Sequence, residues 1–186
     1  MENNENRREY TITFNQANFY SLIFIIPILI IYGIPYYLIW GMAGLKNDIL
    51  LISNSLTDII IFFLSLVIGI IIHEFIHGIF WALKTKQGWD SIDFGINWKA
   101  LAPYAHCNES LRAKKYYPGV VMPGIILGLI PAIAGIITGN AFLWIYGFIF
   151  TMAAGGDAVY LIMLLRLDGN PIIQDHPEKV GFIIYD

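Results

Sequence analysis

The stretch Asp58–Leu83, DIIIFFLSLVIGIIIHEFIHGIFWAL, decides how this chain folds. It exceeds the roughly 20 helical residues that are needed to cross about 30 Å of hydrocarbon. After Asp58 its only ionisable residues are His73, Glu74 and His77. A segment this long and this apolar is typical of a helix that spans a lipid bilayer.

The whole chain has the composition of a membrane protein. Of its 186 residues, 57% are apolar and 13% are charged, whereas soluble domains carry about 25% charged residues. This composition excludes a disordered chain, and a net charge of −3 provides no basic face for a nucleic-acid partner. The single cysteine, Cys107, excludes an intramolecular disulfide and a cysteine-based zinc knuckle. The length fits one domain, residues 1–186.

Three further stretches are long and apolar enough to span a bilayer, so the sequence predicts an all-α membrane protein with four transmembrane helices. The predicted spans are residues 19–40, 58–83, 118–138 and 141–165. Prolines in the first and third spans remove backbone donors and predict kinks there. The first span is too long for a signal peptide and no small-residue cleavage pattern follows it, so we expect it to be retained.

The basic residues predict the orientation of these spans. Of the 11 Lys and Arg residues, all but Lys46 fall on one side of the predicted topology, and basic residues favour the cytoplasmic side. We therefore expect a multi-pass protein of the cell membrane, with both termini, the loop 84–117 and the tail 166–186 in the cytoplasm.

The loop and the chain ends contain short alternating patterns that predict a small cytoplasmic β element. Ser91–Trp98 alternates polar and apolar residues, which is the period of a half-buried strand. We expect residues 99–104 to return as its partner. Tyr10–Phe14 alternates as well, and Val180–Tyr185 is expected to form a further strand or a docking segment.

The residues His73-Glu74-Phe75-Ile76-His77 form an H-E-x-x-H motif. Residues i and i+4 lie on one face of a helix, so both imidazoles can reach one metal ion. A catalytic zinc takes three protein ligands and leaves one position for water, whose pKa it lowers to about 7. Glu74 is then the expected catalytic base. Ionisable residues inside a span cost a few kcal/mol each, which favours this function over hydrogen bonds between helices.

Asp157 is the residue that we expect as the third zinc ligand. The second and fourth predicted spans run in the same direction across the membrane. At 1.5 Å per residue, Asp157, His73 and His77 then lie at one depth, roughly 9–15 Å from the helix ends. A lone carboxylate in an apolar span also needs a cation as partner.

Other residues compete for the role of third ligand. His106 could ligate the metal if its loop folds back under the membrane. Asp168, within Asp-Gly-Asn-Pro, favours a turn after the fourth span, and His176 favours a turn into the tail. Cys107 shows no sign of nucleophilic activation. Zinc is the expected cofactor, although His and Asp also bind other divalent metals.

An H-E-x-x-H near the inner end of one span, with an Asp in a later span, resembles the site-2 protease class of intramembrane zinc metalloproteases. Over most of its length the chain is also similar to a family of small bacterial and archaeal membrane proteins described as putative zincin peptidases. This second similarity rests on His73–Gly78, Phe94–Ile96, Pro103–Cys107, Gly155–Asp157 and Asp175–Phe182.

The site-2 protease resemblance implies roles for four residues: zinc ligands at His73, His77 and Asp157, and a catalytic base at Glu74. The surroundings of the Asp differ, however. Site-2 proteases carry Asn-Pro-x-x-Pro-x-Asp-Gly, whereas Asp157 follows two glycines and precedes Ala158. The oxyanion-stabilising and substrate-gating roles of that motif therefore have no assigned residue.

Together these features predict a zinc-dependent intramembrane endopeptidase, which cuts a membrane protein or membrane-associated peptide near the cytoplasmic leaflet. The alternative is a non-catalytic membrane protein that binds a partner and uses the metal as structure, in which case Glu74 is dispensable. A third hypothesis is an ion or proton path through the buried His, Glu and Asp residues, which requires oligomers around a pore. The sequence leaves the oligomeric state and the substrate open.

Overall fold

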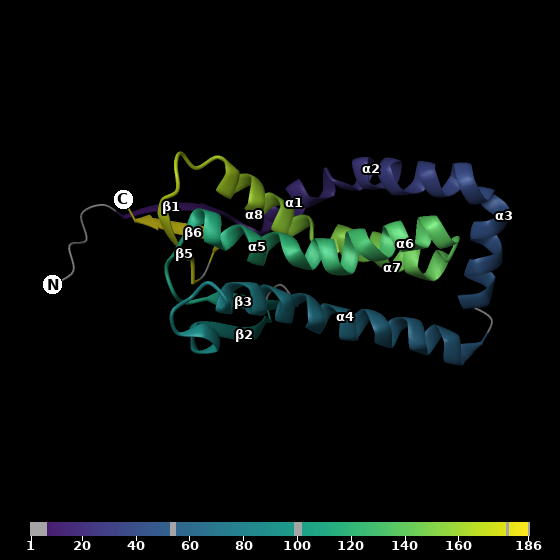
Figure 1. The fold of residues 1–186 in the computed structure, drawn as a ribbon, viewed down its shortest axis with the longest axis horizontal. Helices are drawn as coiled ribbons and strands as arrows, with labels where there is room; N and C mark the ends of the chain where they lie inside the picture. The colour runs from purple at the N-terminus through teal and green to yellow at the C-terminus, as the bar shows by residue number, and fades with distance from the viewer. Residues whose placement is uncertain (1–6, 53–54, 99–101, 178, 186) are drawn as a thin grey trace. The chain divides into compact units, whose positions relative to one another are not determined.

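The structure is a computed structural model that describes residues 7–185 apart from 53–54, 99–101 and 178. The described chain is mostly helical and adds two antiparallel sheets (Figure 1). Its internal contacts divide it into two compact units, each of which is described by itself. Unit 1 comprises Met1–Tyr20, Glu74–Met122 and Gly156–Asp186, and unit 2 comprises Ser21–His73 and Pro123–Gly155.

Helices account for all four apolar stretches of the sequence. The α-helices are α1 (Phe14–Leu22), α2 (Ile25–Ile28), α3 (Ile34–Ile52), α4 (Leu56–Ala82), α5 (Ala113–Pro123), α6 (Ile130–Thr138), α7 (Ala141–Ala153) and α8 (Gly155–Leu165). Wider π-helical turns join α2 to α3 at Leu29–Gly33 and α5 to α6 at Gly124–Leu129. These turns lie beside prolines, which remove the backbone donors that a regular helix needs.

Three helical stretches of the described chain are long and apolar enough to cross a membrane: Phe14–Gly44, Leu56–Ala82 and Ala113–Thr138. The first three predicted spans are thus confirmed as long apolar helices. The predicted fourth span, 141–165, is not one helix, because it is interrupted at Ala154 and passes the same test only when α7 and α8 are counted together. Two glycines follow the break, and glycine weakens a helix by about 1 kcal/mol relative to alanine.

Unit 2 contains the helical hairpin of α6 and α7. Gly139 adopts a left-handed φ of 72° at the turn, and the side chain of Asn140 accepts a hydrogen bond from the Leu143 amide at 3.0 Å to begin α7. The first span is attached to this hairpin, because the hydroxyl of Tyr36 donates to the Gly139 carbonyl at 3.1 Å and the indole of Trp40 donates to the Ile136 carbonyl at 2.8 Å. The third and fourth apolar stretches are therefore joined by a tight turn at Gly139 and Asn140.

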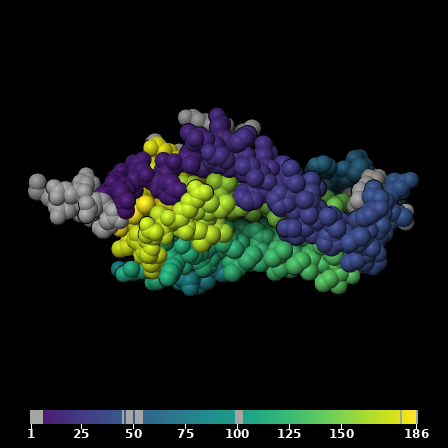
Figure 2. Space-filling model, turned by 90° about the horizontal axis from the view of Figure 1, so that it is seen from above, coloured from purple at the N-terminus to yellow at the C-terminus, as the bar shows by residue number. Residues whose placement is uncertain are grey.

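Unit 2 also exposes a large apolar surface. Many large apolar side chains of its N-terminal helical segment are more than half exposed, among them Ile26, Ile31 and Leu38. Figure 2 shows this segment in purple to blue, with its side chains open on the face in view. Soluble monomers rarely expose a continuous apolar surface of this size, so the exposure is what a lipid-facing helix requires.

Unit 1 contains a four-stranded antiparallel sheet in the order β1-β6-β5-β4. Its strands are β1 (Arg7–Ile12), β4 (Leu111–Arg112), β5 (Ile172–Asp175) and β6 (Val180–Tyr185). The strand expected at Val180–Tyr185 is confirmed, and it pairs with the beginning of the described chain through Tyr10 and Phe182. The strand expected at residues 10–14 ends earlier, because Thr13 and Gln16 exchange capping hydrogen bonds that start α1.

The second sheet of unit 1 is the hairpin of β2 (Ile92–Asn97) and β3 (Ala102–Cys107). Phe94 lies opposite Ala105 in the antiparallel register. The predicted strand at residues 91–98 is therefore confirmed, and its return strand lies slightly later than expected. Part of the expected partner, residues 99–101, lies outside the described residues.

The core of unit 1 joins α5 and α8 to the four-stranded sheet. Tyr116, Leu164, Ile173 and Phe182 are fully buried there. The Tyr116 and Tyr160 rings stack with their centroids 5.8 Å apart, and the Tyr160 ring lies 5.5 Å from that of Phe182. This core fixes the helix segments of unit 1 that carry the residues around the H-E-x-x-H motif.

Candidate metal centre

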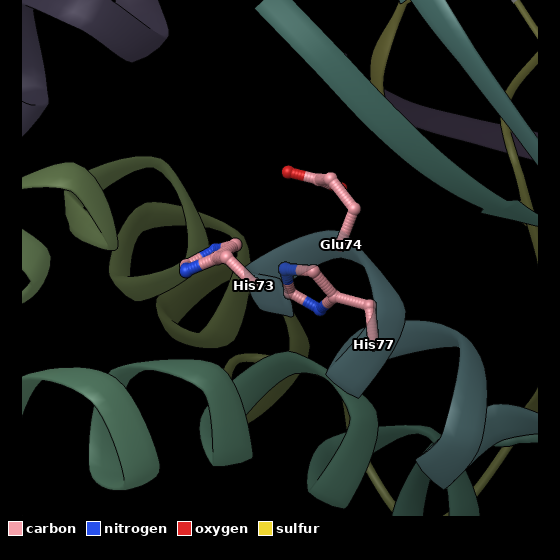
Figure 3. Close-up of side chains that lie close together, drawn as sticks. All are labelled: His73, Glu74 and His77. Atoms are coloured by element: carbon pink, nitrogen blue, oxygen red, sulfur yellow. The ribbon is translucent and has the colours of Figure 1, made fainter. Parts of the chain in front are cut away.

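Helix α4 brings His73, Glu74 and His77 together. Each residue offers one ligand atom, and these three atoms all lie within 4.8 Å of one another. Figure 3 shows the three side chains leaving the same stretch of α4. Both histidines are buried and Glu74 is half-buried. The arrangement depends on this one helix alone, and it is the arrangement that the spacing of the motif predicts.

The carbonyl oxygen of Gly119 in α5 orients the ring of His77. It lies 2.7 Å from Nδ1 of His77, and a carbonyl oxygen can only accept a hydrogen bond, so Nδ1 carries the proton. In the neutral ring the lone pair is then on Nε2. A metal-ligating histidine usually donates its other ring N–H to a carbonyl or carboxylate in this way, which sets the tautomer and the direction of the lone pair.

Asp157 lies on the Nε2 side of His77. Its Oδ1 atom is 3.4 Å from Nε2 of His77, and its side chain is 26% exposed. Asp157 lies in the first turn of α8, where the helix dipole favours a negative charge. Nε2 of His77 and Oδ1 of Asp157 attract each other when either a proton or a metal ion lies between them. Two ligand atoms bound to one tetrahedral zinc at about 2.0–2.2 Å lie about 3.3–3.6 Å apart, so this pair of atoms has a spacing that fits a shared metal ion.

Trp81 supports His77 from the next turn of α4. The two rings stack with centroids 5.2 Å apart and an interplanar angle of 20°. The indole N–H of Trp81 donates to the carbonyl of Tyr116 at 3.1 Å. A Cβ atom at Gly119 would overlap the Trp81 indole, so glycine is needed at 119 for α5 to approach this closely. His77 is therefore held by a hydrogen bond on one edge and by an aromatic ring on its face.

Sequence reasoning missed both supporting residues. Trp81 follows His77 by four residues, and that spacing could have indicated a contact on one helix face. Gly119 had no comparable signal, because its role depends on how α5 packs against α4 in unit 1.

The competing ligands are engaged elsewhere. His106 lies on β3 with Nδ1 3.4 Å from Oδ2 of Asp175, and His176 has Nε2 3.4 Å from Oε2 of Glu9. Asp168 is exposed in the predicted turn, where Gly169 has a φ of 72°. Within the described ranges, the cluster of metal-binding groups consists of His73, Glu74 and His77, so it contains none of these competitors and does not contain Asp157 either.

Two buried groups elsewhere in unit 1, Asp175 and Cys107, have shifted pKa values. Burial raises the pKa of Asp175 above its usual range, although His106 and the hydroxyl of Tyr160 act against that shift. Burial also raises the pKa of the Cys107 thiol to about 12. A thiol with that pKa stays protonated at neutral pH and is not a nucleophile.

One comparison with known proteins gives a match over the region that contains this site. Residues 66–170 match the model of a family described as putative zincin peptidase. The matched region covers more than half of the chain and includes both the H-E-x-x-H motif and Asp157. Searches of curated proteins and of solved structures gave no match.

Proposed function

Because the chain belongs to the putative zincin peptidase family, we propose that it is a zinc metalloprotease that works at the membrane. It cuts a membrane protein or membrane-associated peptide near the cytoplasmic leaflet. The observation that carries this proposal is the cluster of His73, Glu74 and His77 inside an apolar helix that is long enough to span a bilayer.

The zinc ligands in this proposal are His73, His77 and Asp157. His77 supports the assignment through its tautomer, because Gly119 holds the proton on Nδ1 and leaves Nε2 for the metal. Asp157 supports it through its 3.4 Å separation from Nε2. When bound, zinc polarises the scissile carbonyl and lowers the pKa of the attacking water.

Glu74 is the general base and acid of the proposed reaction. A carboxylate oxygen of Glu74 takes the proton from the attacking water, and the same carboxyl then delivers it to the leaving nitrogen. Glu74 is suited to this role because it follows ligand His73 directly and is only half-buried, so water can reach it. A metal that serves only as structure needs no such carboxylate beside it.

The metal site is tested by zinc analysis of the detergent-purified protein. We expect close to one zinc per chain in the wild type and a large loss in both His73→Ala and Asp157→Ala. His106→Ala is the matched control and keeps its zinc, because His106 contacts Asp175 instead. If the wild type takes up no zinc even after zinc is added back, the proposal is wrong.

Catalysis is tested separately with Glu74→Gln. This variant keeps the shape of the side chain but cannot take a proton. In proteoliposomes that contain a panel of single-span model substrates, we expect it to retain zinc and to lose cleavage. A wild type that binds zinc, together with a Glu74→Gln variant that matches it in every function, supports the non-catalytic alternative.

A further inference from the structure

The β2–β3 hairpin has one apolar and one polar face. Successive strand residues point to opposite faces, and residues directly opposite each other in an antiparallel pair share a face. With the observed register, the apolar face consists of Ile92, Phe94, Ile96, Pro103, Ala105 and Cys107. The other face carries the polar residues Asp93, Asn97 and His106 together with Gly95, Ala102 and Tyr104. One face of the hairpin therefore suits an apolar environment, and the other suits an aqueous one.

The base of the apolar face is fixed to α4. Gly78 of α4 leaves room for the Phe94 ring, and a Cβ atom at position 78 would overlap that ring. Phe75 of α4 stacks on Trp89, just before the hairpin, with ring centroids 5.2 Å apart. Figure 1 shows the hairpin beside the C-terminal end of α4. The hairpin is therefore a fixed extension of the helix end.

Among the described residues, much of the rest of the apolar face is exposed. Ile96 is 52% exposed and Trp98, directly after β2, is 76% exposed. Phe94 and Trp89 are also nearly half exposed. A cluster of large apolar side chains that remains exposed in a folded protein marks a surface that a membrane or another molecule covers.

The position of the cluster identifies what covers it. The cluster continues the surface of α4, whose exposed Phe75 belongs to a helix that is long and apolar enough to span a membrane. Tryptophan and tyrosine are enriched where membrane meets water. Lys84 and Lys86, both exposed, lie between α4 and the hairpin, and such cations attract anionic lipid headgroups.

We propose that the apolar face of the β2–β3 hairpin lies in the interfacial layer of an anionic leaflet, between the headgroups and the first acyl methylenes. The backbone limits its depth. The sheet has two strands, and in the described part of the chain no further strand pairs with either outer edge. Apart from the Cys107 amide, which donates to Oδ2 of Asp175, its outward N–H and C=O groups therefore need water or headgroups, which the hydrocarbon core lacks. This segment of the loop 84–117 thus lies in the membrane surface rather than in the bulk cytoplasm.

A fluorescence experiment tests the placement. Ile96→Cys puts a labelling site on the apolar face, and Asn97→Cys puts a matched control on the polar face one residue away. The native Cys107 is fully buried, so a polarity-sensitive dye reacts at the introduced cysteine. Each labelled protein is reconstituted in phosphatidylcholine and phosphatidylglycerol vesicles that contain lipids brominated either high or low on the acyl chain.

The proposal expects bromines high on the chain to quench the label at 96 several-fold more than the label at 97, and more than bromines near the chain ends. Equal, weak quenching at both positions overturns it and indicates that water or protein covers the face. If the bromines near the chain ends quench the label at 96 most strongly, the face lies deeper than the interfacial layer and the proposed depth is wrong. Neither outcome depends on zinc or on proteolysis.

A second comparison tests the anionic leaflet. Quenching of the label at 96 should increase with the fraction of phosphatidylglycerol, and Lys84→Gln with Lys86→Gln should remove that increase. A label whose quenching is independent of lipid charge contradicts the role given to the headgroups.

Discussion

The backbone carbonyl of Gly119 accepts a hydrogen bond from Nδ1 of His77 at 2.7 Å. This contact links α5 to the motif helix and determines which nitrogen of His77 faces Asp157. The same glycine leaves the space that Trp81 occupies beside His77. One residue without a side chain thus sets both the tautomer and the ring position of a proposed zinc ligand.

Gly119→Ala should weaken zinc binding. The new Cβ overlaps the Trp81 indole, so α5 must retreat and the hydrogen bond to His77 lengthens or breaks. Loss of such a partner typically costs about 10–100-fold in metal affinity. Competition with a fluorescent zinc chelator measures the change. Gly33→Ala is the control, because nothing lies within 4 Å of a Cβ at that position, and it should bind zinc as the wild type does.

Trp81→Phe and Trp81→Ala should form a graded series. Phenylalanine keeps an aromatic face against His77 but loses the hydrogen bond to the Tyr116 carbonyl at 3.1 Å, whereas alanine also loses the stack and leaves a cavity. Truncation of a buried tryptophan usually costs about 3–5 kcal/mol of stability. We expect zinc affinity and melting temperature to fall in the order wild type, Phe, Ala. Equal affinity in all three variants would rule out an orienting role for Trp81.

Asp175→Asn should change how stability depends on pH. Because burial raises the pKa of Asp175 above its ordinary value of 3.8, the folded protein holds this proton more tightly than the unfolded chain. Stability from this group is then fully present below 3.8 and is lost as the pH rises through the folded pKa. The asparagine keeps an oxygen for the Tyr160 hydroxyl but has no such loss.

The measurement for Asp175 is the melting temperature in detergent of wild type and Asp175→Asn across the acidic range. Relative to the variant, the wild type should become less stable as the pH rises above 3.8. A difference between the two proteins that is constant with pH contradicts the predicted shift. Asp168→Asn, at an exposed position, serves as control.

The Cys107 thiol should resist alkylation in the folded protein. It is fully buried and its pKa is raised to about 12, so the reactive thiolate is scarce and inaccessible. Maleimide at mildly alkaline pH should label the chain only after denaturation, as mass spectrometry can detect. Rapid labelling of the native protein would show that the unit 1 core opens readily.

Features that depend on local sequence were predictable. Apolar length alone identified the helices that carry the first three spans, and the i, i+4 spacing of His73 and His77 placed both on one helix face. The alternating pattern after α4 identified the hairpin strand at Ile92–Asn97. In each case the deciding interactions lie within a few residues of one another along the chain.

Features that depend on packing were not predictable from one sequence. The apolar run 141–165 hides its interruption at Ala154, because Ala154 and the glycines after it are as apolar as their neighbours. The strand Leu111–Arg112 is too short to show a period. Asp157 does lie 3.4 Å from His77, but its role as a zinc ligand stays a prediction, as do the site-2 protease type and the orientation in the membrane.

The central position of β6 has a consequence for how unit 1 folds. β6 pairs with β1 on one side and with β5 on the other, and the β1–β6 pairs join residues that lie far apart in the sequence. Such non-local pairs form slowly, because the intervening chain loses conformational freedom before the contacts compensate for it. Until β6 is in place, β1 has no partner in the described sheet and the core of unit 1 is incomplete. Gly119 and Trp81, which hold His77, belong to the same unit, so we expect their support of His77 to be complete only after β6 has joined the sheet.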